Sequence, residues 1–376
     1  MQAEQVSWRR VITMGGAFIA FLIGSGFATG QEIMQYFAAY GYAGVLAILV
    51  MFVLFLYVGY SFITVGYEQQ YHTGKPIFRY YCGKYIGAFF EWFSVIFIYM
   101  SYLVMIAGAG AALQQQFGLP TYAGGILIGV LSIVTVMFGL NRIVGVIGLI
   151  GPVIVVLSIF LGIAGVLKNP QGLSQVSAVL PNLDILQASP NWLLSAFSYV
   201  GFCMMWLAAF MASMGAEANS KKEAAFGAIS GALFFSLAVL FVMFGLLANL
   251  GDVAGSQIPS FILANKISPV LAVVFSFIVI LGIYTTSVPL LWTAASRVAP
   301  EKTARFSLGA LALGVAGVVA GLLFPFDRLV NIIYVLNGYI GFMLLFMMVV
   351  KSLRSRIAEK AAYSEAPLAT PQGEAE

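Results

Sequence analysis

The stretch that most constrains the fold is Ile23-Gly24-Ser25-Gly26-Phe27-Ala28-Thr29-Gly30, in the middle of the first long apolar segment, residues 11–39. A straight helix over that segment would measure about 44 Å, against about 30 Å for the hydrocarbon core of a bilayer. Glycine destabilises a helix interior by about 1 kcal/mol relative to alanine. Irregular backbone at membrane depth persists only where protein or a water-filled cavity surrounds it. We therefore expect the first helix to be interrupted at this run.

The composition of the whole chain is that of a membrane protein. Of its 376 residues, 61% are apolar or aromatic and 9% are charged. Soluble domains carry about 25% charged residues, so this chain lacks the polar surface of a soluble protein. Its net charge of +4 gives no reason to expect nucleic acid as a partner. The expected partners are the lipid bilayer and a small-molecule substrate.

Ten apolar segments of spanning length lie between the clusters of charge. They are 11–39, 42–66, 86–114, 122–140, 143–167, 191–215, 224–250, 267–296, 306–324 and 329–350. The predicted fold is an all-α integral membrane protein of ten transmembrane helices in two inverted five-helix repeats. Its expected parts are a cytoplasmic N-terminal segment (1–10), a first repeat (11–167), an extracytoplasmic connector (168–190), a second repeat (191–350) and a cytoplasmic polar tail (351–376).

Lysine and arginine are distributed unevenly between the loops. If the amino terminus is cytoplasmic, the inner side holds all of these 18 residues except Lys168, Lys266 and Arg328. Positive charge favours the cytoplasmic side, so we expect both termini there, in a protein of the plasma or inner membrane. Because each half has an odd number of spans, the second half begins on the opposite side. The halves are then inverted repeats, as in many secondary transporters.

A fainter interruption occurs in the first span of the second half, at Ser198-Tyr199-Val200-Gly201-Phe202. Paired interruptions at corresponding positions of two repeats point to a transporter's binding site, so we expect helices 1 and 6 to be discontinuous. The alternative is that these glycines let neighbouring helices approach closely. Gly201 in particular fits that alternative.

Two motifs resemble known families. The run 23–27 resembles the broken first helix of the amino acid, polyamine and organocation transporter superfamily, and the ten-span inverted repeat is similar to its leucine-transporter-type fold. The longer run Gly-Ser-Gly-Phe-Ala-Thr-Gly-Gln-Glu (24–32) resembles the YkvI-like bacterial proteins, a group assigned as amino acid permeases. The motifs are specific for the fold and say little about the substrate.

The resemblance implies a substrate site at the two interruptions. Backbone amides of the first would hold a substrate carboxylate, and the dipole of the following half-helix favours an anion there. Carbonyls at Ser198 and Tyr199 would receive the amino group. Tyr102 and Phe202 would be lids or pocket walls, with ordinary core packing as the alternative. The expected substrate-binding residues are Gly24, Ser25, Gly26, Thr29, Tyr102, Ser198, Tyr199, Gly201 and Phe202.

The eighth span contains three consecutive hydroxyl residues, Thr285-Thr286-Ser287, and then Pro289. Because Pro289 cannot donate to the carbonyl of Thr285, a free carbonyl lies beside several hydroxyls, which are the oxygen ligands that alkali cations take. The alternative is that the hydroxyls bond back to the preceding turn and repair a proline kink. The Na⁺ ligands that the resemblance implies are the carbonyls of Ala20, Ile23 and Gly282 and the hydroxyls of Thr285 and Thr286.

Glu32 keeps proton coupling open. Proton-coupled relatives often carry a lysine in the fifth span, whereas residues 143–167 contain no Lys, Arg, Asp, Glu or His, so Na⁺ is the first choice. A carboxylate within a spanning segment is by default a functional candidate. A helical rise of about 33 Å from Arg10 would place Glu32 towards the outer rim of the membrane. Its possible roles are a gate, a ligand for a substrate amine, a proton carrier or a residue of that rim. Glu91 is expected at the inner rim, paired with a loop cation.

The sequence favours a transporter over an enzyme. The single histidine, His72, excludes an HExxH site, and there is no P-loop. No organic cofactor is expected. We expect Na⁺-coupled symport of an amino acid or a related small zwitterion or amine by alternating access. The alternatives are a proton-coupled transporter that uses Glu32 and, from another class, a channel or facilitative pore.

Overall fold

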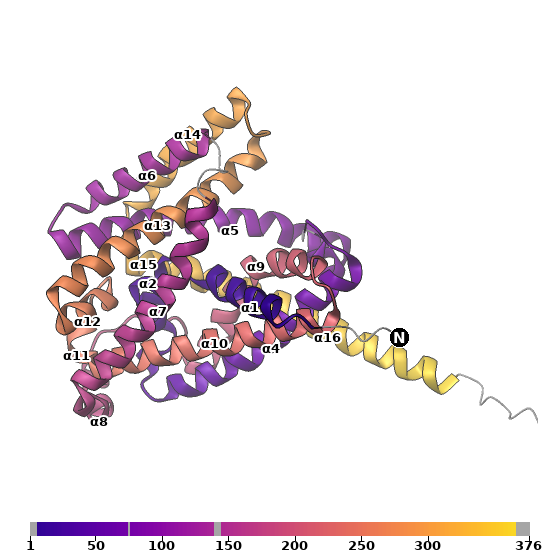
Figure 1. Ribbon diagram of the computed structural model, residues 1–376, viewed down its shortest axis with the longest axis horizontal. Helices are drawn as coiled ribbons and strands as arrows, with labels where there is room; N and C mark the ends of the chain where they lie inside the picture. The colour runs from indigo at the N-terminus through magenta and orange to yellow at the C-terminus, as the bar shows by residue number, and fades with distance from the viewer. Residues whose placement is uncertain (1–5, 74–75, 139–143, 366–376) are drawn as a thin grey trace, which may run out of the picture.

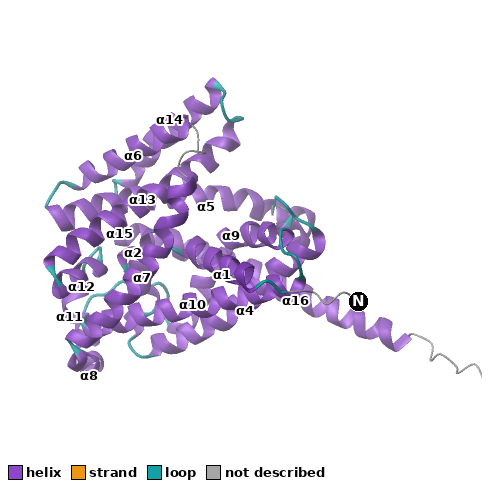
Figure 2. Cartoon of the chain, in the orientation of Figure 1, coloured by secondary structure: helices purple, strands orange, loops and turns teal. Residues whose placement is uncertain are grey.

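The structure is a computed structural model that describes residues 6–73, 76–138 and 144–365, as helices joined by short loops (Figure 2). In the first half the helices are α1 (Trp8–Leu22), α2 (Ser25–Thr29), α3 (Gln31–Tyr36), η1 (Ala38–Tyr40), α4 (Ala43–Gln69), α5 (Ile77–Phe117), α6 (Thr121–Phe138) and α7 (Val144–Lys168). The rest are α8 (Pro170–Val179), η3 (Leu180–Asn182), α9 (Trp192–Ala216), α10 (Lys221–Ala248), α11 (Leu250–Val253), α12 (Pro259–Ile267), α13 (Pro269–Val298), α14 (Ala304–Gly321), α15 (Phe326–Leu329), the π-helical turn η4 (Val330–Tyr334) and α16 (Val335–Glu365).

The predicted all-α membrane protein is confirmed. Within the described residues, nine helices are long and apolar enough to cross a membrane. They match the expected segments from 42–66 onward, and the first expected segment, 11–39, is divided among α1, α2 and α3. α16 continues as a helix to Glu365, into the segment expected to be a polar tail. The division into two inverted repeats and the cytoplasmic position of the termini stay predictions.

The long helices form two groups that lie beside each other (Figure 1). In the group that we call the bundle, α1 packs on α10, α10 on α4 and α4 on α9. In the group that we call the scaffold, α13 packs on α5, α5 on α6, and α14 on both α6 and α13. α7 contacts α10 and α13, and α16 contacts α9 and α5, so these two helices join the groups.

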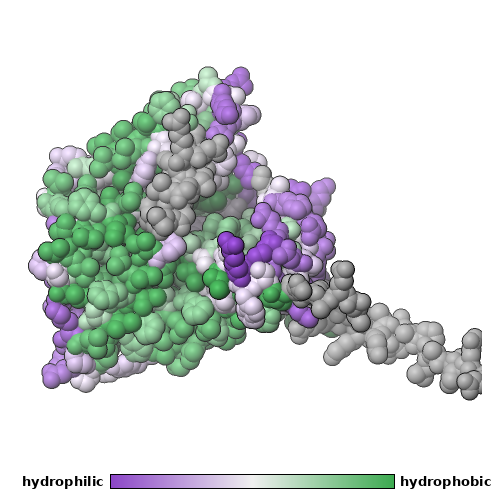
Figure 3. Space-filling model, in the orientation of Figure 1, coloured by the Kyte–Doolittle hydropathy of each residue, from purple (hydrophilic) through white to green (hydrophobic). Residues whose placement is uncertain are grey.

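Apolar side chains cover most of the visible outer face, and polar ones gather near the start of α1 (Figure 3). Buried hydroxyls hold the scaffold together internally. Ser132 of α6 and Ser287 of α13 share a hydrogen bond of 2.6 Å, and Thr135 and Tyr284 share one of 2.7 Å between the same helices. Between helices in lipid, such bonds add to van der Waals packing as a source of association.

The predicted interruption of the first helix is confirmed, and it consists of two turns. α1 ends at Leu22, and Ile23 and Gly24 are extended, with ψ of 98° and −170°. After α2, Gly30 has a φ of +80°, a left-handed conformation that glycine adopts without steric cost. α2 and α3 have only five and six residues. The first span is therefore the helix α1 followed by two short helices, α2 and α3, and the chain changes direction before each of them.

The prediction that helix 6 is discontinuous is wrong. α9, the corresponding helix, runs unbroken from Trp192 to Ala216. A methyl group on Gly201 would overlap the carbonyl oxygen of Gly338, and one on Gly341 would overlap the carbonyl oxygen of Gly201. Gly201 thus lets α9 and α16 cross closely. One glycine costs a helix about 1 kcal/mol, which the packing on α16 outweighs.

Candidate substrate and ion site

A small cavity of about 50 Å³ lies where the first break meets α13. It is large enough for a cation or a few water molecules. Ser25 and Ala28 of α2 and Gly151 of α7 also line it. Every residue predicted to bind Na⁺ borders this cavity: Ala20, Ile23, Gly282, Thr285 and Thr286.

The hydroxyls at this cavity differ in what they bind. Thr285 donates to the carbonyl oxygen of Gly282 at 3.0 Å, so back-bonding to the preceding turn does occur. A hydroxyl that donates one hydrogen bond keeps its acceptor lone pairs, and Thr285 can therefore still serve as an oxygen ligand. Ser287 points elsewhere, because it bonds to Ser132 and to the carbonyl oxygen of Tyr284. Thr285 and Thr286 therefore line the cavity, whereas Ser287, the third hydroxyl residue of the run, does not.

A larger cavity of about 340 Å³ adjoins the break between the bundle and the scaffold. Ala20, Ile23, Gly24, Thr285 and Thr286 line both cavities. The larger one also reaches Trp206 of α9 and Thr293 of α13, and most of its remaining wall is apolar. Its volume lies within the range typical of small-molecule sites.

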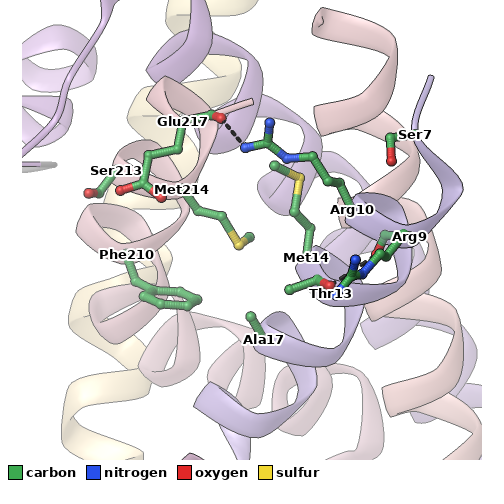
Figure 4. Close-up of a pocket in the computed structure, with 10 residues that line it drawn as sticks. All are labelled: Ser7, Arg9, Arg10, Thr13, Met14, Ala17, Phe210, Ser213, Met214 and Glu217. Carbon is green, nitrogen blue, oxygen red and sulfur yellow. Dashed lines mark hydrogen bonds between the residues drawn. The ribbon is translucent and has the colours of Figure 1, made fainter. Parts of the chain in front are cut away.

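A vestibule of about 620 Å³ opens on the face that carries the start of α1, which we call the terminal face. Figure 4 shows it between α1 and α9, with Ala17 and Phe210 on its walls and Arg10 donating to the carbonyl oxygen of Glu217. The ring of Phe210 stacks on that of Phe21 at a centroid distance of 4.1 Å. Since Phe21 lines the larger cavity and Phe210 lines the vestibule, this stacked pair separates the two spaces.

On the face opposite the terminal face, hydrogen bonds close the molecule beside the break. Gln35 of α3 is fully buried; it donates to the carbonyl oxygen of Asp327 at 2.9 Å and accepts from Asn331 at 3.1 Å. Tyr40 donates to the carbonyl oxygen of Ser189 in the connector at 2.5 Å. These bonds tie the end of the broken span to the connector and to the start of the last span, so the site is hollowed towards the terminal face.

Glu32 lies inside the protein, and of the roles considered for it the exposed residue of the outer rim is therefore excluded. Its side chain is 1% exposed because the turns at Gly24 and Gly30 redirect the chain before the helical rise can carry it outward. The carboxylate folds back onto the break, where a methyl group on Gly26 would overlap Oε1 and lie 2.5 Å from Cδ. Among the described residues its one hydrogen bond comes from the hydroxyl of Tyr199 at 3.4 Å, and no cation pairs with it.

The other predicted site residues make contacts within the protein. Thr29 donates to the carbonyl oxygen of Gly26 at 3.0 Å and so braces the break from within. Phe202 stacks on Tyr334 with ring centroids 4.8 Å apart. Tyr102 and Ser198 face other helices, because their side chains fill the space beside Gly317 and Gly338 respectively. The substrate roles of these residues stay predictions.

Some residues of the site could not be found from their sequence context. Trp206 borders the larger cavity, and Tyr334 ends the π-helical turn; such turns often occur at functional sites but carry no sequence signature. Tyr36 had a usable signal, since it follows Glu32 by four residues and so shares its helix face. Glu91 pairs with a cation as expected, but its partner at 2.9 Å is Arg79 within helix α5 instead of a loop residue, and its position at the inner rim stays a prediction.

The comparisons with known proteins give two distant relatives. No family model matches the chain. YyaD of Bacillus subtilis (strain 168), described as an uncharacterized protein, is 25% identical over 291 residues, which cover 77% of this chain and 82% of YyaD. YkvI of the same organism, described as an uncharacterized membrane protein, is 23% identical over 324 residues, which cover 86% of this chain and 91% of YkvI.

Solved structures show the same fold at low identity. The manganese transporter of Eremococcus coleocola, in complex with an aromatic bis-isothiourea substituted compound, has a TM-score of 0.54 at 13% identity, covering 96% of this chain and 90% of that one. MhsT in complex with L-phenylalanine has a TM-score of 0.53 at 16% identity, covering 88% and 87%. Mhp1 in an inward-facing conformation has a TM-score of 0.51 at 14% identity, covering 90% and 75%. The chain therefore has the leucine-transporter-type fold of these solved structures, and it is similar over most of its length to the Bacillus membrane protein YkvI and to YyaD.

Proposed function

We propose that this protein is a secondary active transporter that uses a Na⁺ gradient to accumulate an amino acid or a related small amine. The observation that carries the proposal is the cavity of about 50 Å³ that all five expected Na⁺ ligands border. These ligands come from α1, from the break and from α13. Na⁺ bound there would hold the bundle and the scaffold in one relative position.

Alternating access would follow from a change in the relative position of the bundle and the scaffold. The structure is hollowed at the terminal face and closed by Gln35 and its partners at the opposite face. With the terminal face in the cytoplasm, as the loop cations indicate, this is an inward-facing state. Substrate would occupy the larger cavity, and the Phe21 and Phe210 rings would separate it from the vestibule. Rocking of the bundle against the scaffold would then close the vestibule and open the other face.

A metal ion is a poor candidate for the substrate. One relative in fold is a manganese transporter, and transition metals bind to clustered carboxylate, imidazole or thiolate ligands. In the part of the chain that the structure describes, no three His, Cys, Asp or Glu residues lie close enough to hold one. The apolar wall of the larger cavity and its few hydroxyls suit an organic solute.

Uptake into proteoliposomes tests the coupling ion. Labelled amino acids and amines are presented with an inward Na⁺ gradient, an inward proton gradient or neither. We expect accumulation with Na⁺, reduced about tenfold or more in Thr285→Val and Thr286→Val, because each variant removes a ligand oxygen while keeping the side chain's shape. Thr64→Val is the matched control, since the buried hydroxyl of Thr64 also bonds back to the preceding turn of its helix but lines neither cavity. Uptake that is indifferent to Na⁺ in the unaltered protein contradicts Na⁺ coupling.

Proton coupling is the second candidate, and the burial of Glu32 favours it. A carboxylate without a partner cation inside a protein is costly unless a proton or another cation neutralises it. In this case a proton gradient drives uptake, and Glu32→Gln abolishes that response while Glu91→Gln preserves it. Flux that equilibrates and never concentrates the solute would instead indicate a facilitative pore.

A further inference from the structure

An apolar groove of about 480 Å³ lies on the outside of the molecule, where α4, α9 and α16 meet. It shares no lining residue with the two cavities at the break or with the vestibule. Leu345 of α16 is buried at the groove, whereas Val53 of α4 and Phe346 of α16 line it and are largely exposed. In a spanning protein, the groove therefore opens towards the lipid.

The length of the groove matches one leaflet of a bilayer. Along α16 it extends from Phe342 to Leu353, which is about 16 Å of helix. The hydrocarbon core is about 30 Å thick, so a spanning helix of another protein would extend far beyond the groove. Lipid tails are as apolar as leucine side chains, and an empty groove would leave its walls without van der Waals partners. An acyl chain fits the groove in both length and polarity.

The end of the groove at Leu353 is polar. The hydroxyls of Tyr57 and Ser352, which both line the groove, share a hydrogen bond of 2.9 Å there. That bond uses one of their two hydroxyl hydrogens, and the other has no acceptor among the described residues. An ester or phosphate oxygen of a lipid headgroup would accept it.

This polar end lies towards the terminal face. Glu68, next to the end of α4, pairs with Lys221 at the start of α10, and Glu223 of the same turn pairs with Arg10 of α1. The end of α4 and the start of α1 are therefore on one face. α16 continues to Glu365, beyond the other helices on that face (Figure 1). A lipid whose headgroup lies at the polar end thus belongs to the leaflet on the terminal face.

Positive charge follows the polar end along α16. Lys351, Arg354 and Arg356 fall within six residues that contain no acidic residue. Arg354 is exposed, and among the described residues no carboxylate pairs with it or with Lys351. Basic residues next to a membrane attract anionic lipids by about 1 kcal/mol each. The charge beside the groove is therefore complementary to a negatively charged headgroup.

We propose that this groove binds an anionic phospholipid from the leaflet on the terminal face. One acyl chain fills the groove, a headgroup oxygen accepts from the Tyr57 and Ser352 pair, and the negative charge lies beside the cations of α16. The walls belong to two helices of the bundle, α4 and α9, and to α16, which also contacts the scaffold. The bound lipid therefore stabilises the position of α16 against the bundle.

Native mass spectrometry of the delipidated full-length protein tests the headgroup. The probes are dioleoylphosphatidylglycerol and dioleoylphosphatidylcholine, which share their chains and differ in net charge. We expect the phosphatidylglycerol to bind about tenfold or more tightly. Arg354→Gln combined with Arg356→Gln should remove most of that preference. The control, Lys302→Gln combined with Arg305→Gln, changes two exposed cations beside α14 and should preserve it. Equal affinity for the two lipids, or a preference that survives the α16 double variant, would overturn the proposal.

Tryptophan substitutions test the position of the acyl chain. Val349 lines the groove and is 39% exposed, so Val349→Trp should occupy part of the groove and weaken the binding of both lipids about tenfold or more. Val53→Trp fills the groove from α4 and serves if Val349→Trp does not fold. Val274→Trp is the control, because Val274 of α13 is 49% exposed and does not line the groove. Lipid binding that is unchanged in both groove variants would contradict the proposal. No solute or gradient enters this measurement, so its result is independent of the coupling ion.

Discussion

Gly26 and the carboxylate of Glu32 occupy adjoining space inside the break, and this contact explains why the position holds glycine. Its hydrogen leaves room for Oε1 and Cδ of Glu32, which any larger side chain would displace. The run of glycines around it therefore does more than weaken the helix. It leaves space for an acidic side chain directly against the backbone of the break.

We expect Gly26→Ala to reduce uptake at least about tenfold, because the added methyl group pushes the carboxylate away from Tyr199, and to lower the free energy of unfolding by about 1–3 kcal/mol through overpacking. Transport assays and thermal unfolding of the purified protein measure the two effects. Gly16→Ala is the control, since a methyl group there meets nothing within 4 Å. Unchanged uptake in Gly26→Ala would show that Glu32 has no role at its observed position.

Among the helices, α9 illustrates how a glycine with a site-like sequence context can serve packing. Gly201 lies in the run 198–202 that resembles a break, yet α9 is continuous, and its contact is with the backbone of α16 at Gly338 and Gly341. The crossing holds one helix of the bundle against a helix that also contacts the scaffold. Small residues on both helices make this approach possible.

Gly201→Ala and Gly341→Ala should each destabilise the protein by about 1–3 kcal/mol, since a methyl group at either position overlaps a carbonyl oxygen across the crossing. The KM for uptake, measured on the fraction that remains folded, should stay the same. Gly251→Ala, whose methyl group meets nothing within 4 Å, should leave stability almost unchanged. A Gly201→Ala protein of normal stability but weakened substrate affinity would instead place Gly201 in the binding site.

For the molecule as a whole, opening and closing depend on two sets of contacts at opposite faces. The Gln35 bonds to Asp327 and Asn331 close one face, while the vestibule at the other face is open. If the bundle rocks as a unit, these contacts are made in one state and lost in the other. Their removal should therefore change the populations of the two states rather than the fold.

Gln35→Ala should lower the rate at which a thiol reagent labels Ala17→Cys in the vestibule, because losing these bonds destabilises the state that is open at the terminal face. About 1 kcal/mol lost there corresponds to a change of roughly fivefold in the population ratio. Both native cysteines are first replaced by alanine. Asn182→Ala, which removes a bond within the connector to Ala178, is the control. An unchanged labelling rate in Gln35→Ala would mean that this network does not govern access.

The membrane class, nine of the ten expected spanning helices in the described residues and the break at residues 24–30 were predictable from sequence, because each depends on local chemistry. Apolar length sets the spans, and glycine with a left-handed turn sets the interruption. The hydroxyl run in α13 was recognisable for the same reason. A break in α9 was wrongly predicted, because Gly201 serves a close contact with Gly338, in a helix more than a hundred residues away, and no local pattern reveals that contact.

Only the tertiary structure placed Glu32. Its distance along the chain from Arg10 indicated the rim, whereas two turns of backbone, at Gly24 and Gly30, return it to Gly26 beside Tyr199. Aromatic rings from α3, α9 and η4 likewise pack together there without sharing a sequence motif: those of Tyr36, Tyr199, Phe202 and Tyr334. Sequence periodicity reports the environment along one helix, but a substrate site between helices depends on the directions in which those helices are turned, and only packing of the whole chain sets these directions.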